Sequence, residues 1–417
     1  LKNAVILYAL FSAIHFTTAL NCVSSSGSNK DWWILLKTPR LSSSKSSFVK
    51  NGTAYTYIDS TTKSLIFLNK DITASDSPLA KTLEPLYQNK FELSYMYNDE
   101  TPENKTGTNY GHTKGVIGFA GNEGFWLLHS CPAFPPSPLQ SFSYPDDGLI
   151  YGQSFLCLTL DVKNLNQVGI LQQYNHPLIY INRITTSASL IMPDLSAAMN
   201  GTFISKKGDS KILDLTTQNN TKFRGYAKNA PYGKELQGEL IAPDIDEDME
   251  WQTWMRPFES PYCPSKKTNQ VYNIQNVSAS IDSTQTNSES RNNKDISNSK
   301  KYFTSIESEN IKDEYGSNDL NANDLIWGTG NDHSKWGISL GSRNTKNKNI
   351  IKRITSLFKN SISASSQNNT FCIGDMNRMA SQKKRGGGAV CMQNKAVHDM
   401  LAQIITKDDK QDCKSVE

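Results

Sequence analysis

The chain has 417 residues, 37% of them hydrophobic, with a formal net charge of +4 at pH 7 and a mean hydropathy of −0.52. This length allows a large buried core, either as one large domain or as two halves. The mild net charge does not by itself indicate a nucleic-acid partner, although a phosphate-binding cleft can be basic locally. Beyond the first twenty residues, no segment is long and apolar enough to span a membrane.

The N-terminal residues have the layout of a secretory signal peptide. Lys2 precedes the apolar run "AVILYALFSAIHF", and the small residues Thr17 and Ala19 follow it. This pattern predicts a signal peptide over residues 1–19 with cleavage after Ala19. The apolar run is short for crossing about 30 Å of hydrocarbon, which disfavours a membrane anchor. We therefore expect a secreted or lysosomal protein without stable membrane association.

Sequons and cysteines agree with export. The seven cysteines are widely spaced and include no CxxC pair, so disulfides in an oxidising compartment are favoured over a zinc site. An odd number leaves at least one thiol free or paired between chains. Asn-x-Ser/Thr sequons, the acceptors of N-linked glycans, occur at Asn51, Asn104, Asn200, Asn219, Asn276 and Asn368.

Apolar runs predict the ordered elements. The segments "WWILLK", "AYTYIDS" and "YGQSFLCLTLDV" are typical of strands, and "LAKTLEPLYQ" of a short helix interrupted by Pro85. Further along, "MPDLSAAMN" resembles a helix and the region around "FRGYAK" a strand. Together these runs indicate an α/β protein.

Two polar stretches interrupt this pattern. Residues 278–323 are rich in Ser, Asn, Asp, Glu and Lys and predict a disordered-like surface insertion. Residues 341–369 form a basic insertion in which Ile350, Ile354 and Leu357 have the spacing of an amphipathic helix. Such a helix can meet an anionic surface, but packing against its own domain is the favoured alternative.

Two His-x-Lys triplets, "HTK" and "HSK", are the candidate chemical groups. Residues two apart in a strand point to one face, so His112 and Lys114 would share one space, as would His333 and Lys335. A lysine neutralises phosphate oxygens, while a histidine attacks phosphorus or donates a proton to the leaving oxygen. One such triplet is weak evidence, because a surface histidine and lysine look the same.

Their surroundings strengthen the interpretation. After "HTK" the chain reads as a β-hairpin about Asn122, which would place Lys114 opposite Ser130. After "HSK" and the basic insertion, "TFCIGDMNR" predicts a return strand. The sequence therefore contains two copies of one arrangement, which could face each other around a single phosphate.

A family resemblance becomes specific at this point. The segments "LEPLY", "YND", "GHTKGV", "FWLLHS", "YGQSFLC", "NDHSKW", "CIGDMNR" and "RGGGAVC" resemble, in this order, those of the deoxyribonuclease II family. The match runs from about Cys22 to Cys391. It implies a phospholipase-D-like fold, a pseudo-dimer of two mixed-sheet α/β halves in one chain. The N-terminal half, residues 20–183, would carry the first triplet and the C-terminal half, residues 184–417, the second.

The resemblance also implies an activity. The expected enzyme is an endonuclease that hydrolyses DNA at acid pH, without metal or other cofactor, and leaves 3′-phosphate and 5′-hydroxyl ends. His112 and His333 would be the catalytic pair, one forming a phosphohistidine intermediate and the other protonating the leaving oxygen. Lys114 and Lys335 would hold the non-bridging oxygens. An acid optimum follows if one imidazole, with an ordinary pKa of about 6.5, begins protonated. Candidates for orienting the histidines are His129, Ser130, Asp375 and Asn377.

Departures from the family pattern leave a second hypothesis open. The family disulfides suggest Cys22–Cys157 and Cys263–Cys391, but Gly337 stands where a family cysteine follows the tryptophan. Cys372 thus lacks its usual partner, and Cys413 or Cys131 would substitute. An acidic residue common after the first triplet is also absent, with Ala120 in that region. An exported, non-catalytic DNA-binding effector of the same fold is therefore the alternative. Another phosphodiesterase, such as a phospholipase, is disfavoured by the ordered motifs.

A basic run near the C-terminus is a candidate substrate contact. Lys383, Lys384 and Arg385 precede flexible glycines and could follow a DNA backbone through phosphate contacts. A solvated loop would have the same sequence.

Overall fold

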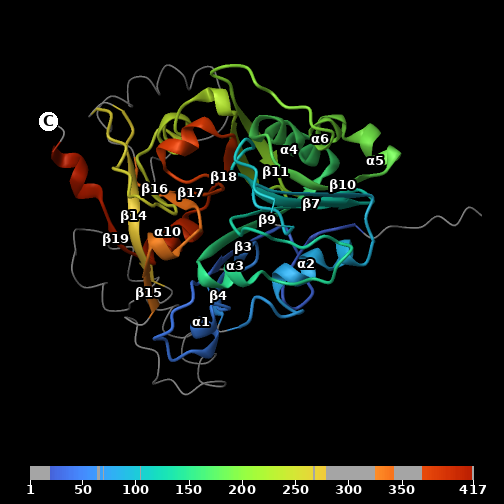
Figure 1. The fold of residues 1–417 in the computed structure, drawn as a ribbon, viewed down its shortest axis with the longest axis horizontal. Helices are drawn as coiled ribbons and strands as arrows, with labels where there is room; N and C mark the ends of the chain where they lie inside the picture. The colour runs from blue at the N-terminus through green and yellow to red at the C-terminus, as the bar shows by residue number, and fades with distance from the viewer. Residues whose placement is uncertain are drawn as a thin grey trace, which may run out of the picture.

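The computed structural model describes residues 19–62, 66–68, 70–103, 105–265, 268–278, 325–341 and 369–415. The predicted signal peptide, apart from Ala19, and almost all of the insertions predicted at 278–323 and 341–369 lie outside these residues. The described chain forms two large β-sheets with helices between and around them (Figure 1). This mixed α/β architecture confirms the predicted fold class and is consistent with a phospholipase-D-like fold of two halves.

The first sheet has eight strands in the order β10-β6-β7-β8-β9-β3-β4-β5, all antiparallel. Its central strands are covered on both faces, which explains why "WWILLK" is an uninterrupted apolar run. The strands are β3 Trp32–Lys37, β4 Tyr55–Asp59, β5 Ile66–Leu68, β6 Leu93–Asn98, β7 Lys114–Ala120, β8 Glu123–His129, β9 Gln153–Asp161 and β10 Ile179–Ile184; β1 Cys22–Val23 and β2 Asn29–Lys30 form a separate pair.

The second sheet contains nine described strands in the order β11-β12-β18-β17-β16-β13-β14-β15, with β19 also paired to β14. Within it only β13 and β14 run parallel among the described pairs. The strands are β11 Ser210–Thr216, β12 Lys222–Lys228, β13 Met249–Gln252, β14 Val271–Ser278, β15 Ile326–Gly328, β16 Trp336–Ser339, β17 Thr370–Gly374, β18 Gly387–Gln393 and β19 Ile405–Asp408.

Helices cover the sheets and fill the space between them. Helix α4, Val162–Asn175, packs against β8 and β9 of the first sheet and against β11, β12 and β18 of the second. The other described α-helices are α1 Ser47–Asn51, α2 Pro78–Tyr87, α3 Asp146–Ile150, α5 Thr186–Ile191, α6 Pro193–Met199, α7 Ala242–Ile245 and α10 Lys395–Gln403; 3₁₀ or π turns lie at Ala230–Tyr232, Gln237–Ile241, Thr329–Asn331, Ala380–Lys384 and Lys410–Ser415.

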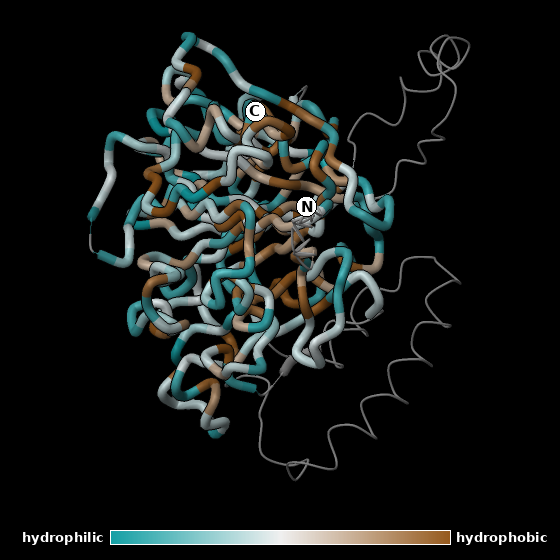
Figure 2. Tube along the Cα trace, turned by 90° about the vertical axis from the view of Figure 1, so that its right-hand side faces the viewer, coloured by the Kyte–Doolittle hydropathy of each residue, from teal (hydrophilic) through white to brown (hydrophobic). Residues whose placement is uncertain are grey.

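One hydrophobic core joins the two sheets. Its buried residues include Trp32 and Ile34 of β3 together with Trp336 and Ile338 of β16. Figure 2 shows apolar segments concentrated inside the molecule, whereas the peripheral loops are mostly polar. Burial of both inner faces in one cluster fixes the sheets relative to each other. The predicted boundary at 183/184 stays a prediction.

Most predicted elements appear, with one clear omission. The strands β3, β4, β9 and β12, the helices α2 and α6, and the return strand β17 lie where the sequence predicted them. Pro85 does not interrupt α2 but lies inside its last turn. Helix α4 was not predicted, because Asn164, Gln172 and Asn175 are polar residues buried on its packed side.

The disulfide prediction is half correct. Cys22–Cys157 is confirmed, but the predicted Cys263–Cys391 is wrong, because Cys391 pairs with Cys372 and Cys263 with Cys413. Cys372 lies opposite Gly337 on β16 and opposite Cys391 on β18. Since Gly337 has no thiol, Cys391 is the cross-strand partner within reach, which leaves Cys263 to Cys413. Cys131, also considered for Cys372, is a buried free cysteine.

Surface features leave the export prediction open. Asn51, Asn200 and Asn219 are exposed, Asn276 is partly buried in β14, and the sequons at 104 and 368 lie outside the described residues. In the described parts of the chain no helix could cross a membrane. The disulfides are compatible with an extracellular or lysosomal protein.

Candidate active site

The two His-x-Lys triplets lie at matching places in the two sheets. Lys114 is the first residue of β7, and Lys335 directly precedes β16. Strand β7 pairs with β6 and β8, as β16 pairs with β13 and β17. Both histidines therefore lie in the loops that lead into these strands, rather than within the strands as the spacing predicted.

Backbone hydrogen bonds cross between the sheets and bring the triplets together. The His112 N–H donates to the Gly386 carbonyl at 2.8 Å, and the His333 N–H donates to the Gly152 carbonyl at 2.8 Å. Gly386 directly precedes β18 of the second sheet, and Gly152 directly precedes β9 of the first. Each sheet thus fixes the backbone of the histidine that belongs to the other.

The side chains of the triplets share one electropositive site. Burial, and then the charge of Lys114, lower the pKa of Lys335 to about 7. Burial, followed by the charges of Lys335 and Lys114, lowers the pKa of His333 to about 2. Each triplet therefore acts electrostatically on the other, which places both in one electropositive region.

His112 has polar and charged neighbours. Its Nδ1 is hydrogen-bonded to the main-chain carbonyl of Asp375, and its Nε2 lies 3.9 Å from Oδ2 of Asp99. Asp99 also forms ion pairs with Lys114 and, at 2.9 Å, with Arg385. Burial lowers the pKa of His112 well below its ordinary value, and the Asp99 carboxylate opposes that shift. Burial raises the pKa of Asp99, but Lys114, His112 and Arg385 together hold it below its ordinary value.

His333 has aromatic neighbours instead. Its ring stacks on Tyr151 with centroids 4.0 Å apart and an interplanar angle of 9°. The Trp254 ring meets it edge-on at 5.2 Å. Its Nε2 is buried without a hydrogen-bond partner among the described residues, and its carbonyl accepts a 2.6 Å bond from Nζ of Lys335. This ring is therefore positioned by packing rather than by an ion pair.

Ser130 contributes to the site indirectly. Its Oγ donates to Oε1 of Gln153 at 2.6 Å and accepts the Ser154 N–H at 2.9 Å. Oγ of Ser154 in turn accepts the Lys335 N–H at 3.1 Å. Ser130 thereby supports the backbone of the second triplet through Ser154.

His129 lies near the site but packs away from it. It is fully buried, stacked on Phe155 at 5.8 Å and edge-to-face with Phe134 at 5.4 Å. Burial, and then the charge of Lys114, lower its pKa to about 3. The structure thus surrounds it with aromatic rings rather than with either candidate catalytic histidine.

The carboxyl-terminal candidates differ in what they contact. Asp375 touches His112 through its main-chain carbonyl, while its carboxylate accepts the Gly388 N–H at 2.8 Å. Burial raises the pKa of that carboxyl to about 7. Asn377 is buried, and in the part of the chain that the structure describes its Oδ1 has no hydrogen-bond partner.

The basic run divides between solvent and the site. Lys384 is exposed and Lys383 partly exposed, whereas Arg385 turns inward to Asp99 and donates from Nε to the Tyr110 carbonyl at 3.0 Å. Arg385 therefore belongs to the site around His112.

Sequence reasoning missed Asp99, Tyr151 and Trp254. Asp99 follows β6 and Tyr151 stands two residues before β9, within the quoted segments "YND" and "YGQSFLC". The signal was a polar or aromatic residue at the end of a predicted strand, but nothing in the chain order connects these strand ends to the triplets.

The two departures from the family pattern have local explanations. Ala120 ends β7, six residues beyond Lys114 and so about 20 Å from it along the strand, while Asp99 supplies a carboxylate beside Lys114. A side chain at Gly337 would meet the Trp251 ring, since an added Cβ would lie 2.5 Å from it.

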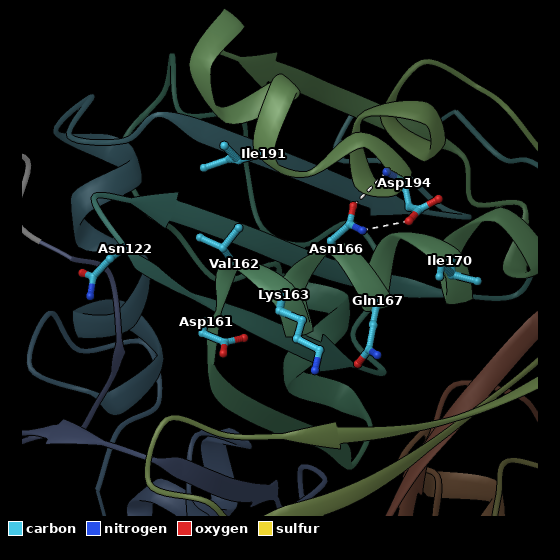
Figure 3. Close-up of a pocket in the computed structure, with 9 residues that line it drawn as sticks. All are labelled: Asn122, Asp161, Val162, Lys163, Asn166, Gln167, Ile170, Ile191 and Asp194. Carbon is cyan, nitrogen blue, oxygen red and sulfur yellow. Dashed lines mark hydrogen bonds between the residues drawn. The ribbon is translucent and has the colours of Figure 1, made fainter.

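A pocket elsewhere on the molecule is separate from this site. It is a cavity of about 690 Å³ lined by residues that include Asn122, Asp161, Lys163 and Asp194 (Figure 3). Asn122 is in the β7–β8 turn and Asp161 ends β9, so the pocket lies at the opposite end of the first sheet from Lys114.

The fold and site together define a mixed α/β protein with two His-Lys motifs joined at one electropositive centre. Within the described ranges, no group of three or more His, Cys, Asp or Glu side chains could hold a metal ion. A sequence model of the family described as deoxyribonuclease II matches residues 21–411. The chain therefore belongs to the deoxyribonuclease II family and is a nuclease of that class.

Relatives agree over most of the chain. Plancitoxin-1 of Acanthaster planci is 26% identical over 386 residues, covering 91% of this chain and 89% of its own length. Deoxyribonuclease-2-alpha of Mus musculus is 26% identical over 382 residues, covering 90% and 89%. Deoxyribonuclease-2 of Caenorhabditis elegans is 29% identical over 288 residues, covering 62% and 76%.

Proposed function

We propose that this protein is an acid endonuclease that hydrolyses DNA phosphodiester bonds without metal, through a phosphohistidine intermediate. The observation that carries the proposal is the meeting of two His-Lys motifs, each fixed by the other sheet. Lys114 and Lys335 supply two cations for the non-bridging oxygens of one phosphate, and His112 and His333 supply two imidazoles.

The reaction divides into two balanced steps. One imidazole attacks phosphorus, so that a P–N bond forms and the P–O5′ bond breaks, while the other imidazolium gives its proton to the leaving 5′-oxygen. That second imidazole then removes a proton from water, whose oxygen attacks phosphorus and displaces the first histidine. The products are a 5′-hydroxyl and a 3′-phosphate.

The charges favour binding and turnover in acid. Below about pH 7 Lys335 is cationic and the Asp375 carboxyl is neutral, since burial moves both pKa values to about 7. Above that pH a cation is lost and an anion gained, and both changes weaken attraction for phosphate. The lowered pKa values of His112 and His333 likewise require acid, or a bound phosphate, to hold a proton.

We also propose the compartment and the domain organisation. The predicted signal peptide at 1–19, the sequons and the disulfides support a glycosylated protein of the secretory route, either secreted or lysosomal. The cross-sheet bonds support halves of residues 20–183 and 184–417 that complete one site. The exposed Lys384 and partly exposed Lys383 are the proposed contacts with the DNA backbone.

The test is cleavage of plasmid DNA near pH 5 in excess EDTA by wild-type protein and by His112→Ala and His333→Ala. We expect nicking by wild type only, with 3′-phosphate ends, and a loss of at least about a hundredfold in each variant. Binding of DNA by folded wild-type protein without cleavage would contradict the enzyme and support the non-catalytic effector.

A further inference from the structure

Two buried lysines outside the His-x-Lys motifs occupy equivalent places in the two sheets. Lys37 ends β3 and pairs with Gln153 of β9, and Lys228 ends β12 and pairs with Gly387 of β18. Lys37 is 2% exposed and Lys228 is fully buried. Burying an ammonium group is costly unless fixed acceptors surround it, so the acceptors of each lysine indicate its role.

The acceptors are main-chain carbonyls, and those of Leu149 in α3 and of Gln382, Lys383 and Arg385 belong to the segments that lead into β9 and β18, whereas Gly52 follows α1. Nζ of Lys37 donates to Leu149 at 2.9 Å and to Gly52 at 3.0 Å. Nζ of Lys228 donates to Lys383 and Gln382 at 3.2 Å and to Arg385 at 2.6 Å. Among the described residues, no carboxylate is hydrogen-bonded to either ammonium.

One acceptor of each lysine has the same position in its segment. Leu149 stands three residues before Gly152, and Lys383 stands three residues before Gly386. Gly152 and Gly386 are the residues whose carbonyls accept the backbone N–H of His333 and His112. Each lysine therefore binds a segment whose glycine carbonyl accepts a histidine N–H. Lys37 binds the segment that contacts His333, and Lys228 binds the segment that contacts His112.

We propose that Lys37 and Lys228 are positioning residues of the reaction, Lys37 for His333 and Lys228 for His112. This inference rests on the proposed function of the two histidines. Both ammonium groups are charged at acid pH, since burial lowers the pKa of Lys37 only to about 7 and that of Lys228 only to about 8. Charged donors bind carbonyls more strongly than neutral ones.

The test measures backbone hydrogen exchange at the two histidines. The chain has six histidines, so isotope labelling of histidine gives few amide signals, which His112→Ala and His333→Ala assign. In Lys228→Met we expect exchange of the His112 amide to accelerate roughly tenfold or more while that of His333 is unchanged, by analogy with other residues that orient site groups. Lys37→Met should give the reverse.

Activity supplies the second measurement. Each variant should lower kcat for plasmid cleavage by roughly ten- to a hundredfold, with a smaller change in KM, because misplacing a reacting group acts mainly on the chemical step. Lys30→Met is the matched control. Lys30 pairs with Asp59 at 2.9 Å and stands just before β3, whereas Lys37 is the last residue of that strand. Loss of Lys30 should therefore change neither the exchange rates of the two histidine amides nor kcat.

The outcomes separate the two proposals. Equal acceleration at both histidines, or none at either, would overturn the positioning role, and Lys37→Gln and Lys228→Gln give the same comparison if a methionine variant does not fold. If the two lysine variants show the crossed exchange pattern but the wild-type protein leaves DNA uncut, the proposed function is overturned and the positioning role is kept. If the wild-type protein cleaves DNA but the variants show no crossed pattern, the positioning role is overturned and the proposed function is kept.

Discussion

His112 and His333 are held by matching backbone bonds but have opposite side-chain surroundings. Beside His112 the structure places Asp99, whose carboxylate forms ion pairs with both Arg385 and Lys114. Around His333 it places the rings of Tyr151 and Trp254. The carboxylate favours a proton on His112, whereas the rings give His333 no comparable support. Backbone placement is thus shared, and proton affinity is set separately at each histidine.

The positions that differ are themselves related. Asp99 follows β6, the neighbour of β7, and Trp254 follows β13, the neighbour of β16. Arg385 directly precedes Gly386, and Tyr151 directly precedes Gly152. Equivalent strand ends in the two sheets therefore supply charged side chains to His112 and aromatic rings to His333. This difference suits two imidazoles with different tasks in one reaction.

Removing the carboxylate should have the largest effect on this difference. Asp99→Asn leaves Lys114, which is 5% exposed, without its ion pair, so we expect unfolding free energy to fall by about 3 kcal/mol or more. Because the folded pKa of Asp99 is lowered, its contribution is complete above its unfolded pKa and is lost as pH falls through the folded value. Urea unfolding at pH 7 and at pH 3 measures the full contribution and the beginning of its loss.

The same variant should move the pH profile. Without Asp99 the pKa of His112 falls further, so the limb of the cleavage profile that reports His112 should shift to lower pH. Asp214→Asn is the control, since its pair with Arg224 is exposed and contributes about 0–1 kcal/mol. An unmoved profile in Asp99→Asn would contradict the assigned role of the carboxylate.

Removing a ring should have a smaller effect, confined to His333. Trp254→Ala deletes the edge-on contact at 5.2 Å, and we expect a stability loss of about 1 kcal/mol beyond the lost burial, together with a roughly tenfold loss of cleavage. Trp254→Phe keeps an aromatic edge and should retain most activity. Equal activity of the alanine and phenylalanine variants would show that the ring does not position His333.

A further expected effect concerns the pH dependence of stability. The folded pKa of His333 is about 2, below its unfolded value of about 6.5. Between those values the unfolded chain binds more protons at this residue, so its contribution to stability falls as pH drops. His333→Gln should therefore lose less thermal stability than wild type between pH 7 and pH 4. Parallel melting curves for the two proteins over that range would contradict the buried, neutral imidazole.

The sequence predicted the strands and the His-Lys pairs but not the contacts between distant strand ends. Apolar runs such as "WWILLK" identified central strands, and the spacing of His112 and Lys114 identified one half of the site. Asp99 was not identifiable as a partner of Arg385, because an ion pair between residues so far apart in the chain depends on tertiary docking. Helix α4 was missed because its packed face carries buried amides.

Pairing within the sheets was predicted less well than the strands themselves. The hairpin about Asn122 was predicted with Lys114 opposite Ser130, but Gly115 pairs with Leu128 and Ala120 with Glu123, a register in which Lys114 faces His129. A slip of one residue is a small error in a turn, yet it changes every cross-strand neighbour. The disulfide error at Cys391 has a different origin: the predicted pairing followed the family pattern, whereas cross-strand adjacency to Cys372 decides it in the structure.

The hydrogen bond from His112 to Gly386 has a consequence for synthesis of the chain. A ribosome completes the whole first sheet long before it reaches residue 386, so the emerging polypeptide carries one histidine whose anchor does not yet exist. His333 has its own anchor, Gly152, from the moment it appears. On the proposed mechanism, chemistry that needs both imidazoles in place therefore waits until almost the entire chain has been made.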